Sequence, residues 1–96
     1  MSRDIDLQLG HRLRRRRRLM GFTQKELGAL CGVRFQQIQK YESAANRISA
    51  SMIVRLARAL RVEVTYFYDG IAEATQEAPQ GRGIRLDPPG TGSEAA

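Results

Sequence analysis

The sequence predicts an all-α protein with one small helical domain over residues 4–70 and a flexible, mostly disordered tail over residues 71–96. A chain of 96 residues has room for one domain of ordinary size. Within the domain the apolar side chains recur at spacings of three and four, as on one face of a helix, and no run alternates with the period of a strand. All three prolines lie in the tail, whose few large aliphatic side chains cannot form a core.

The first two helices are predicted from their apolar faces and their ends. The first ends at Gly21, and its core-facing side chains are Ile5, Leu9, Leu13 and Met20. Thr23 is followed three residues later by Glu26, a capping box that opens the second helix. That helix closes at Gly32, and its core-facing side chains are Leu27, Leu30 and Cys31.

Three shorter helices are predicted to follow. The third carries the apolar residues Phe35, Ile38 and Tyr41. Ser49 can cap a fourth helix, whose apolar stripe comprises Met52, Ile53, Leu56, Ala57 and Leu60. A fifth ends before Gly70 and contains Val62, Val64, Phe67 and Tyr68. Because the connections are short, we expect the five helices to pack around one core at steep angles.

Residues 24–43 contain a motif with a physical reason for its composition: they read QKELGALCGVRFQQIQKYES. Two helices that cross through a tight turn need a small residue where they touch and a glycine where the backbone turns, and Gly28 and Gly32 meet both needs. The helix that follows exposes Gln36, Gln37, Gln39 and Lys40. Glutamine and lysine suit base edges and phosphates, so this pattern indicates nucleic-acid recognition.

The charge and the scarce reactive residues argue against other classes of protein. Lys and Arg number 16 against 10 Asp and Glu, so a net charge of +6 predicts an anionic partner. Only one cysteine, Cys31, and one histidine, His11, are present, too few for a disulfide framework, a zinc site or a catalytic pair. We therefore expect no enzyme activity and no cofactor. No apolar run is long enough to span a membrane or to serve as a secretory signal, so we expect a cytoplasmic protein without a membrane partner.

Over residues 7–68 the chain resembles the Cro/CI phage-repressor type of helix-turn-helix regulator, also called the xenobiotic-response-element family. The matching residues are Leu9 to Arg14, Arg17, Gly21 to Leu27, Gly32-Val33, Ile38, Tyr41-Glu42 and Ser49 to Leu60. The resemblance implies a five-helix lambda-repressor-like fold and a homodimer that places each third helix in the major groove of a palindromic DNA operator. It also favours repression of transcription as the output.

The chain departs from the family pattern at three positions. Arg34 stands where the family usually has a Ser or Thr cap, Ala44 replaces a common glycine, and Ile48 replaces a common proline. We therefore do not expect the family's side-chain cap before the third helix, and we expect the loop after it to differ in shape.

Two groups of residues are candidates for contact with double-stranded DNA. The base-edge candidates lie on the third helix and are Phe35, Gln36, Gln37 and Lys40, with Phe35 open to an alternative role in packing under the turn. The phosphate candidates are Thr23 and Gln24 at the start of the second helix, Arg34, and the positions that the resemblance assigns to backbone contacts, namely Arg14, Asn46 and Arg47.

The run Arg14–Arg18 sweeps the whole circumference of the first helix, so one arginine must face inward and needs a carboxylate partner. In the central part of the chain the only acids are Glu26, which the cap uses, and Glu42. Helical phase places Arg16 nearest the apolar stripe, whereas the resemblance assigns Arg17 as the partner of Glu42. Arg15 and Arg18 of the run, and Arg55, Arg58 and Arg61 further along, are expected on solvated faces.

Two alternatives stand beside a DNA-binding repressor. The same fold can act as a DNA-binding antitoxin whose residues 71–96 fold on a toxin partner. In a different class, residues 12–18 can bind RNA or an anionic membrane as an isolated basic helix. Such a helix needs neither Gly28 and Gly32 nor the glutamines that follow them. Their presence therefore favours a DNA-binding helix-turn-helix domain over an isolated basic helix.

Overall fold

The computed structural model describes residues 2–71, all of whose regular elements are helical. In chain order they are α1 (Ser2–Leu19), α2 (Gln24–Cys31), α3 (Phe35–Glu42), α4 (Ala50–Leu60) and a short 3-10 helix, η1 (Val64–Phe67). The predicted all-α class is confirmed. The expected fifth helix is a single 3-10 turn of four residues. The expectations for residues 72–96 lie outside the described part of the chain.

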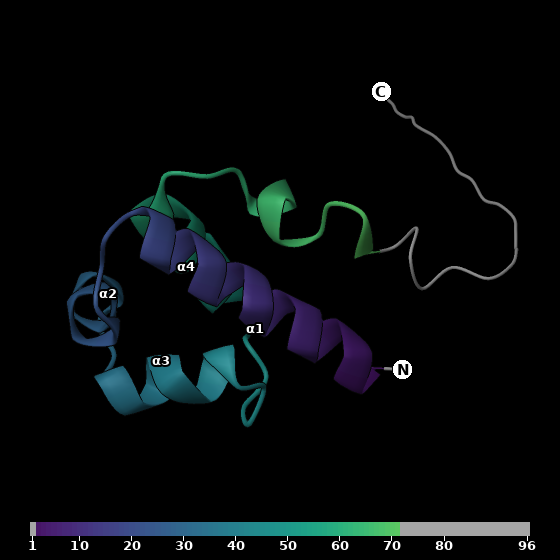
Figure 1. The fold of residues 1–96 in the computed structure, drawn as a ribbon, viewed down its shortest axis with the longest axis horizontal. Helices are drawn as coiled ribbons and strands as arrows, with labels where there is room; N and C mark the ends of the chain where they lie inside the picture. The colour runs from purple at the N-terminus through teal and green to yellow at the C-terminus, as the bar shows by residue number, and fades with distance from the viewer. Residues whose placement is uncertain (1, 72–96) are drawn as a thin grey trace, which may run out of the picture.

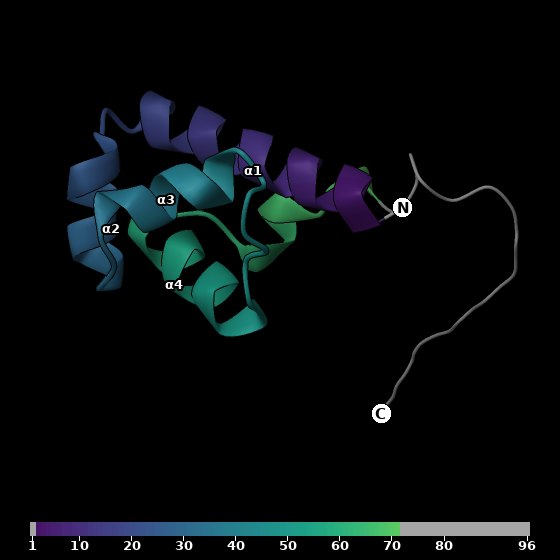
Figure 2. The ribbon, with the colours of Figure 1, turned by 90° about the horizontal axis from the view of Figure 1, so that it is seen from below.

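Helix α1 crosses the molecule in front of α4, and α3 runs beneath both (Figure 1). Figure 2, seen from below, shows α3 between α1 and α4 with its outer side toward the viewer. Helix α2 lies at the N-terminal end of α3, where the short turn between the two brings them into contact. This arrangement leaves one long side of α3 uncovered.

The predicted caps of α2 and α4 are present. The backbone N–H of Glu26 donates to the Thr23 hydroxyl over 3.0 Å, and the backbone N–H of Thr23 donates to the Glu26 carboxylate over 2.8 Å. Gly32 ends α2 in the left-handed conformation, with φ of 77°. The Ser49 hydroxyl accepts from the backbone N–H of Met52. Arg34 precedes α3 without a side-chain cap, as its departure from the family pattern predicts.

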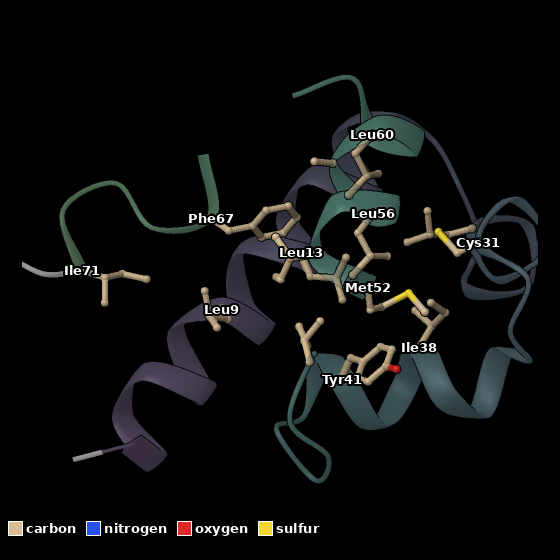
Figure 3. Packing of buried hydrophobic residues seen from close by; sticks show 14 residues of the cluster. Leu9, Leu13, Cys31, Ile38, Tyr41, Met52, Leu56, Leu60, Phe67 and Ile71 are labelled. Carbon is tan, nitrogen blue, oxygen red and sulfur yellow. The ribbon is translucent and has the colours of Figure 1, made fainter. Parts of the chain in front are cut away.

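The core lies between all four α-helices and η1 (Figure 3). All five residues of the predicted α4 stripe are buried, and the largest fully buried side chains are Phe67, Leu13, Leu27, Ile38, Ile53, Leu56 and Leu60. Burial of one such side chain contributes about 1.5–3 kcal/mol. Phe67 of η1 therefore anchors the end of the domain to α1 and α4.

Two predictions about burial are wrong. Leu30, expected in the core, is 59% exposed, because the buried face of α2 is centred on Leu27, Gly28 and Cys31 and Leu30 lies off to one side. Ile71, which we assigned to the tail, is only 3% exposed and belongs to the core cluster. The packed domain thus extends one residue past the predicted boundary, and α1 begins at Ser2, ahead of the predicted start of the domain at residue 4.

Two glycines allow helices to approach closely. A Cβ atom on Gly28 would lie 2.6 Å from the carbonyl oxygen of Val33, which confirms the predicted need for a small residue at the contact between α2 and the turn. A Cβ atom on Gly10 of α1 would lie 2.6 Å from the carbonyl oxygen of Glu42 and 2.7 Å from that of Tyr41. The first helix therefore packs directly on the backbone at the end of α3.

Candidate nucleic-acid interface

The uncovered side of α3 carries the base-edge candidates. Gln36 and Lys40 are exposed, Gln37 is partly exposed, and the Phe35 ring is 44% exposed. A shallow hollow of about 380 Å³ lies beside this row and is lined by Val33, Arg34, Gln36, Gln37 and Lys40. The arrangement presents two amides and an ammonium group along the outer side of α3, with the Phe35 ring beside Gln36 on a neighbouring hollow.

The opposite side of α3 is held by its buried residues. Ile38 and Tyr41 lie in the core, at 0% and 8% exposure, and Glu42 is buried beside them. Since residues 36 and 40 fall roughly opposite residue 38 on a helix of about 3.6 residues per turn, burial of Ile38 turns them outward.

A buried ion pair joins α1 to the end of α3. The Arg17 Nε donates to Glu42 Oε2 over 2.6 Å, and Arg17 Nη2 donates to Oε1 over 3.1 Å. The two side chains are only 10% and 5% exposed. Arg17 Nη1 also donates to the carbonyl of Phe22 in the turn before α2, so the guanidinium links three segments.

Arg16, which helical phase favoured, has a different partner. Its Nε donates over 2.9 Å to the carbonyl of Leu60, at the C-terminal end of α4. Arg12 likewise donates to the carbonyl of Tyr66, whose hydroxyl donates back to the carbonyl of Arg12. Sequence reasoning sought only carboxylates as partners, and missed that helix-end carbonyls can satisfy an inward guanidinium.

Gln24 couples α2 to the same ion pair. Its Nε2 donates over 3.1 Å to Glu42 Oε1. Its side-chain carbonyl and the backbone N–H groups of Gln24 and Lys25 have no partner within residues 2–71. Thr23, the cap of α2, uses its hydroxyl oxygen to accept from Glu26, so only its O–H remains to donate. The N-terminal turn of α2 therefore offers N–H and O–H donors, of the kind that bind a phosphate.

The remaining phosphate candidates fall in three places. Arg34 is exposed at the turn before α3 and lines the hollow beside the glutamines. Asn46 and Arg47 are exposed in the loop after α3. Arg14 is exposed on α1, where it lines a second open hollow together with His11, Arg15, Arg18 and Leu19. The structure thus brings the α2 and α3 candidates together, with Arg14 on a separate hollow.

The loop after α3 is tied to the first turns of α1. Arg3 Nη1 donates over 2.9 Å to the carbonyl of Ala44, which has a left-handed φ of 63° in place of the family's glycine. The Arg47 Nε pairs with Asp6 Oδ2 over 3.4 Å. Neither contact was predicted, since both join residues 41 positions apart in the sequence.

The single cysteine of the chain lies in the core. Cys31 is 4% exposed, and burial raises the pKa of its thiol while the nearby Arg55 charge acts in the opposite direction. A raised pKa keeps the thiol protonated and unreactive. Between residues 2 and 71 no three His, Cys, Asp or Glu side chains gather as metal ligands would. In that same range, every helix is too short or too polar to cross a bilayer.

Comparison with protein families and solved structures gives concordant matches. A family model described as helix-turn-helix matches residues 13–67. The HTH-type transcriptional regulator y4aM of Sinorhizobium fredii is 40% identical over 77 residues, covering 80% of this chain and 54% of the relative. The chain spans about half the length of the curated relatives it matches.

Two solved structures are similar in sequence as well as in fold. The restriction-modification controller protein C.AhdI of Aeromonas hydrophila is 30% identical, with a TM-score of 0.63 over 67% of this chain and 96% of that protein. The P22 c2 repressor, solved in complex with a synthetic operator, is 27% identical, with a TM-score of 0.60 over 65% of this chain and 94% of the repressor.

Proposed function

Because this chain belongs to the helix-turn-helix family of the Cro/CI type, we propose that it is a transcriptional regulator that binds double-stranded DNA at specific sequences. The observation that carries the proposal is the uncovered face of α3, where Gln36, Gln37 and Lys40 project from a helix whose other side is locked into the core. An α-helix fits the major groove of B-form DNA, where each base pair presents a distinct pattern of donors and acceptors.

The exposed side chains of α3 suit different bases. Gln36 and Gln37 can each donate to and accept from one adenine, and Lys40 can donate to the acceptors of guanine. Phe35, at the first position of α3 and 44% exposed, supplies an apolar surface for a thymine methyl group.

Contacts with the sugar–phosphate backbone set the register of α3 in the groove. The N-terminal turn of α2, with Thr23 and Gln24, binds one phosphate, aided by the helix dipole. Arg34, Asn46 and Arg47 lie at the two ends of α3 and bind phosphates on either side of the groove. Arg14 reaches the backbone from α1.

The protein acts as a homodimer on a palindromic operator in the bacterial cytoplasm and represses transcription by occupying a promoter. The P22 c2 repressor, similar in fold and sequence, was solved in complex with an operator, which supports operator binding and repression. Val64 and Tyr68, exposed at 38% and 42% on either side of the buried Phe67, are candidates for the dimer contact.

Selection of genomic DNA fragments bound by the full chain, followed by sequencing, tests the proposal. We expect a short inverted repeat whose half-sites are centred about 10 base pairs apart, since the two α3 helices of a dimer enter successive major grooves. A half-site without symmetry would refute the dimer, and the absence of any enriched sequence would refute sequence-specific binding.

A further inference from the structure

Asp6 and Arg47 form an ion pair that joins α1 to the loop after α3. The carboxylate approaches the guanidinium at Nε, over 3.4 Å. The Asp6 side chain is only 17% exposed, whereas the Arg47 side chain is 70% exposed. The acid is therefore mostly covered by the domain, whereas the arginine extends from it into solvent.

The contact at Nε leaves both Nη atoms of Arg47 available for another ligand. A guanidinium has five N–H donors, four of them on the two Nη atoms, which form the fork that binds phosphate oxygens in pairs. Within residues 2–71 the polar contact of Arg47 is confined to Nε. Asp6 thus restrains the inner part of the guanidinium without occupying the outer part.

The backbone beneath Arg47 is held by other contacts. Arg3 donates to the carbonyl of Ala44, the N–H of Asn46 donates to the carbonyl of Lys40 over 3.2 Å, and Ile48 is buried at 8% exposure. Since these contacts fix the loop on both sides of Arg47, Asp6 acts on the arginine side chain rather than on the course of the chain.

We propose that Asp6 is a positioning residue for DNA binding: it directs the Nη atoms of Arg47 toward a backbone phosphate beyond the C-terminal end of α3. This inference rests on the proposed function, in which Arg47 binds a phosphate. The direction in which DNA affinity changes when Asp6 is removed distinguishes this role from simple repulsion. Removal of an acidic residue near DNA ordinarily strengthens binding, because the phosphate backbone repels it. Removal of Asp6 weakens binding, because Arg47 must then be ordered at the expense of side-chain entropy.

The test measures DNA affinity across a salt series for Asp6→Ala, Asp6→Asn, Arg47→Ala and the Asp6→Ala, Arg47→Ala double variant. Arg15→Ala, alone and combined with Asp6→Ala, is the matched control, because Arg15 is exposed on α1 and makes no ion pair within residues 2–71. The probes are the selected operator and an unrelated duplex of equal length. Melting temperatures establish that each variant is folded, and an exposed ion pair of this kind affects them little.

We expect Asp6→Ala to weaken binding to both duplexes by about threefold or more and to flatten the salt dependence. The effect disappears when Arg47 is already alanine, whereas Asp6→Ala and Arg15→Ala combine additively. Asp6→Asn retains an acceptor oxygen and part of the affinity.

Other outcomes overturn the inference and separate it from the proposed function. If Arg47→Ala weakens binding but Asp6→Ala leaves it unchanged or strengthens it, Asp6 has no positioning role and the proposed function stands. If Arg47→Ala has no effect, Arg47 binds no phosphate and the inference falls. If the unaltered chain binds neither duplex, the proposed function falls with it.

Discussion

Replacement of Glu42 by glutamine removes one charge from the most deeply buried ion pair of the domain. Glu42 accepts two hydrogen bonds from Arg17 and one from Gln24, and its side chain is 5% exposed. After the change, the amide nitrogen of the new glutamine must face a donor on Arg17 or on Gln24. The Arg17 guanidinium also remains buried without a counter-charge.

Loss of one partner from a buried pair costs about 3–5 kcal/mol. For a domain of this size each kcal/mol lowers the melting temperature by about 4–8 °C, so we expect a fall of about 12 °C or more. Specific DNA binding is expected to weaken in parallel, because Arg17 and Gln24 hold the end of α3 against α1 and α2 through Glu42.

Thermal and urea denaturation followed by circular dichroism measure the effect, with Glu26→Gln as the matched control. Glu26 is exposed in the capping box, where glutamine serves equally well, so its replacement leaves stability nearly unchanged. Combining Arg17→Met with Glu42→Leu recovers stability relative to either single change, since no lone charge remains buried. Equal melting temperatures for Glu42→Gln and Glu26→Gln would refute the reasoning and show that the pair contributes nothing.

Three further predictions concern packing, phosphate contacts and the buried thiol. Gly28→Ala and Gly10→Ala each place a Cβ atom 2.6 Å from a backbone carbonyl oxygen, whereas the Cβ atom of Gly21→Ala, in a strained turn, meets no atom within 4 Å. In urea denaturation we expect Gly28→Ala and Gly10→Ala each to lose more stability than the roughly 1 kcal/mol that Gly21→Ala loses. Equal losses would contradict the close packing. If a dimer contacts about six to ten phosphates, the log–log salt slope is about −5 to −9, and Arg14→Ala flattens it on every sequence alike; an altered sequence preference would contradict a phosphate role. Because burial raises the pKa of Cys31, its contribution to the free energy of unfolding is fully present below the ordinary thiol pKa of 9.0 and declines as the pH rises above it. The rate of thiol alkylation checks the burial: equal rates in the folded and the unfolded protein would contradict it.

The helix ends were predictable because their causes are local. The Thr23–Glu26 capping box, the Gly32 stop and the Ser49 cap each depend on residues within one turn of the helix. The apolar stripe of α4 was equally predictable, since its residues recur at spacings of three and four, as on one face of a helix, and no strand-like alternation competes with that spacing.

The errors and omissions arise where residues distant in the sequence decide the outcome. Leu30 faces solvent because the close approach of Gly28 to Val33 fixes which side of α2 is buried. Ile71 joins the core because η1 turns the chain back onto α1, which no local pattern indicated.

The candidate site was predictable in composition but not in its connections. The motif identified α3 and its exposed polar row from sequence alone. The links from α1, namely Arg17 to Glu42 and Asp6 to Arg47, depend on which side of α1 lies against α3. Helical phase favoured Arg16 because it measured distance from the apolar stripe and not the position of α3 beside it.

The claim that α3 reads the DNA sequence is tested most directly by the affinity of Gln36→Ala for the selected operator and for random duplex DNA. Gln8→Ala serves as the control, because Gln8 is a glutamine of α1, partly exposed, and belongs to neither group of DNA-contact candidates. We expect Gln36→Ala to lose about 1–3 kcal/mol of binding free energy on the operator and almost none on random DNA, with Gln8→Ala unchanged on both. Equal losses on the operator and on random DNA would contradict the assignment of α3 as the reading helix.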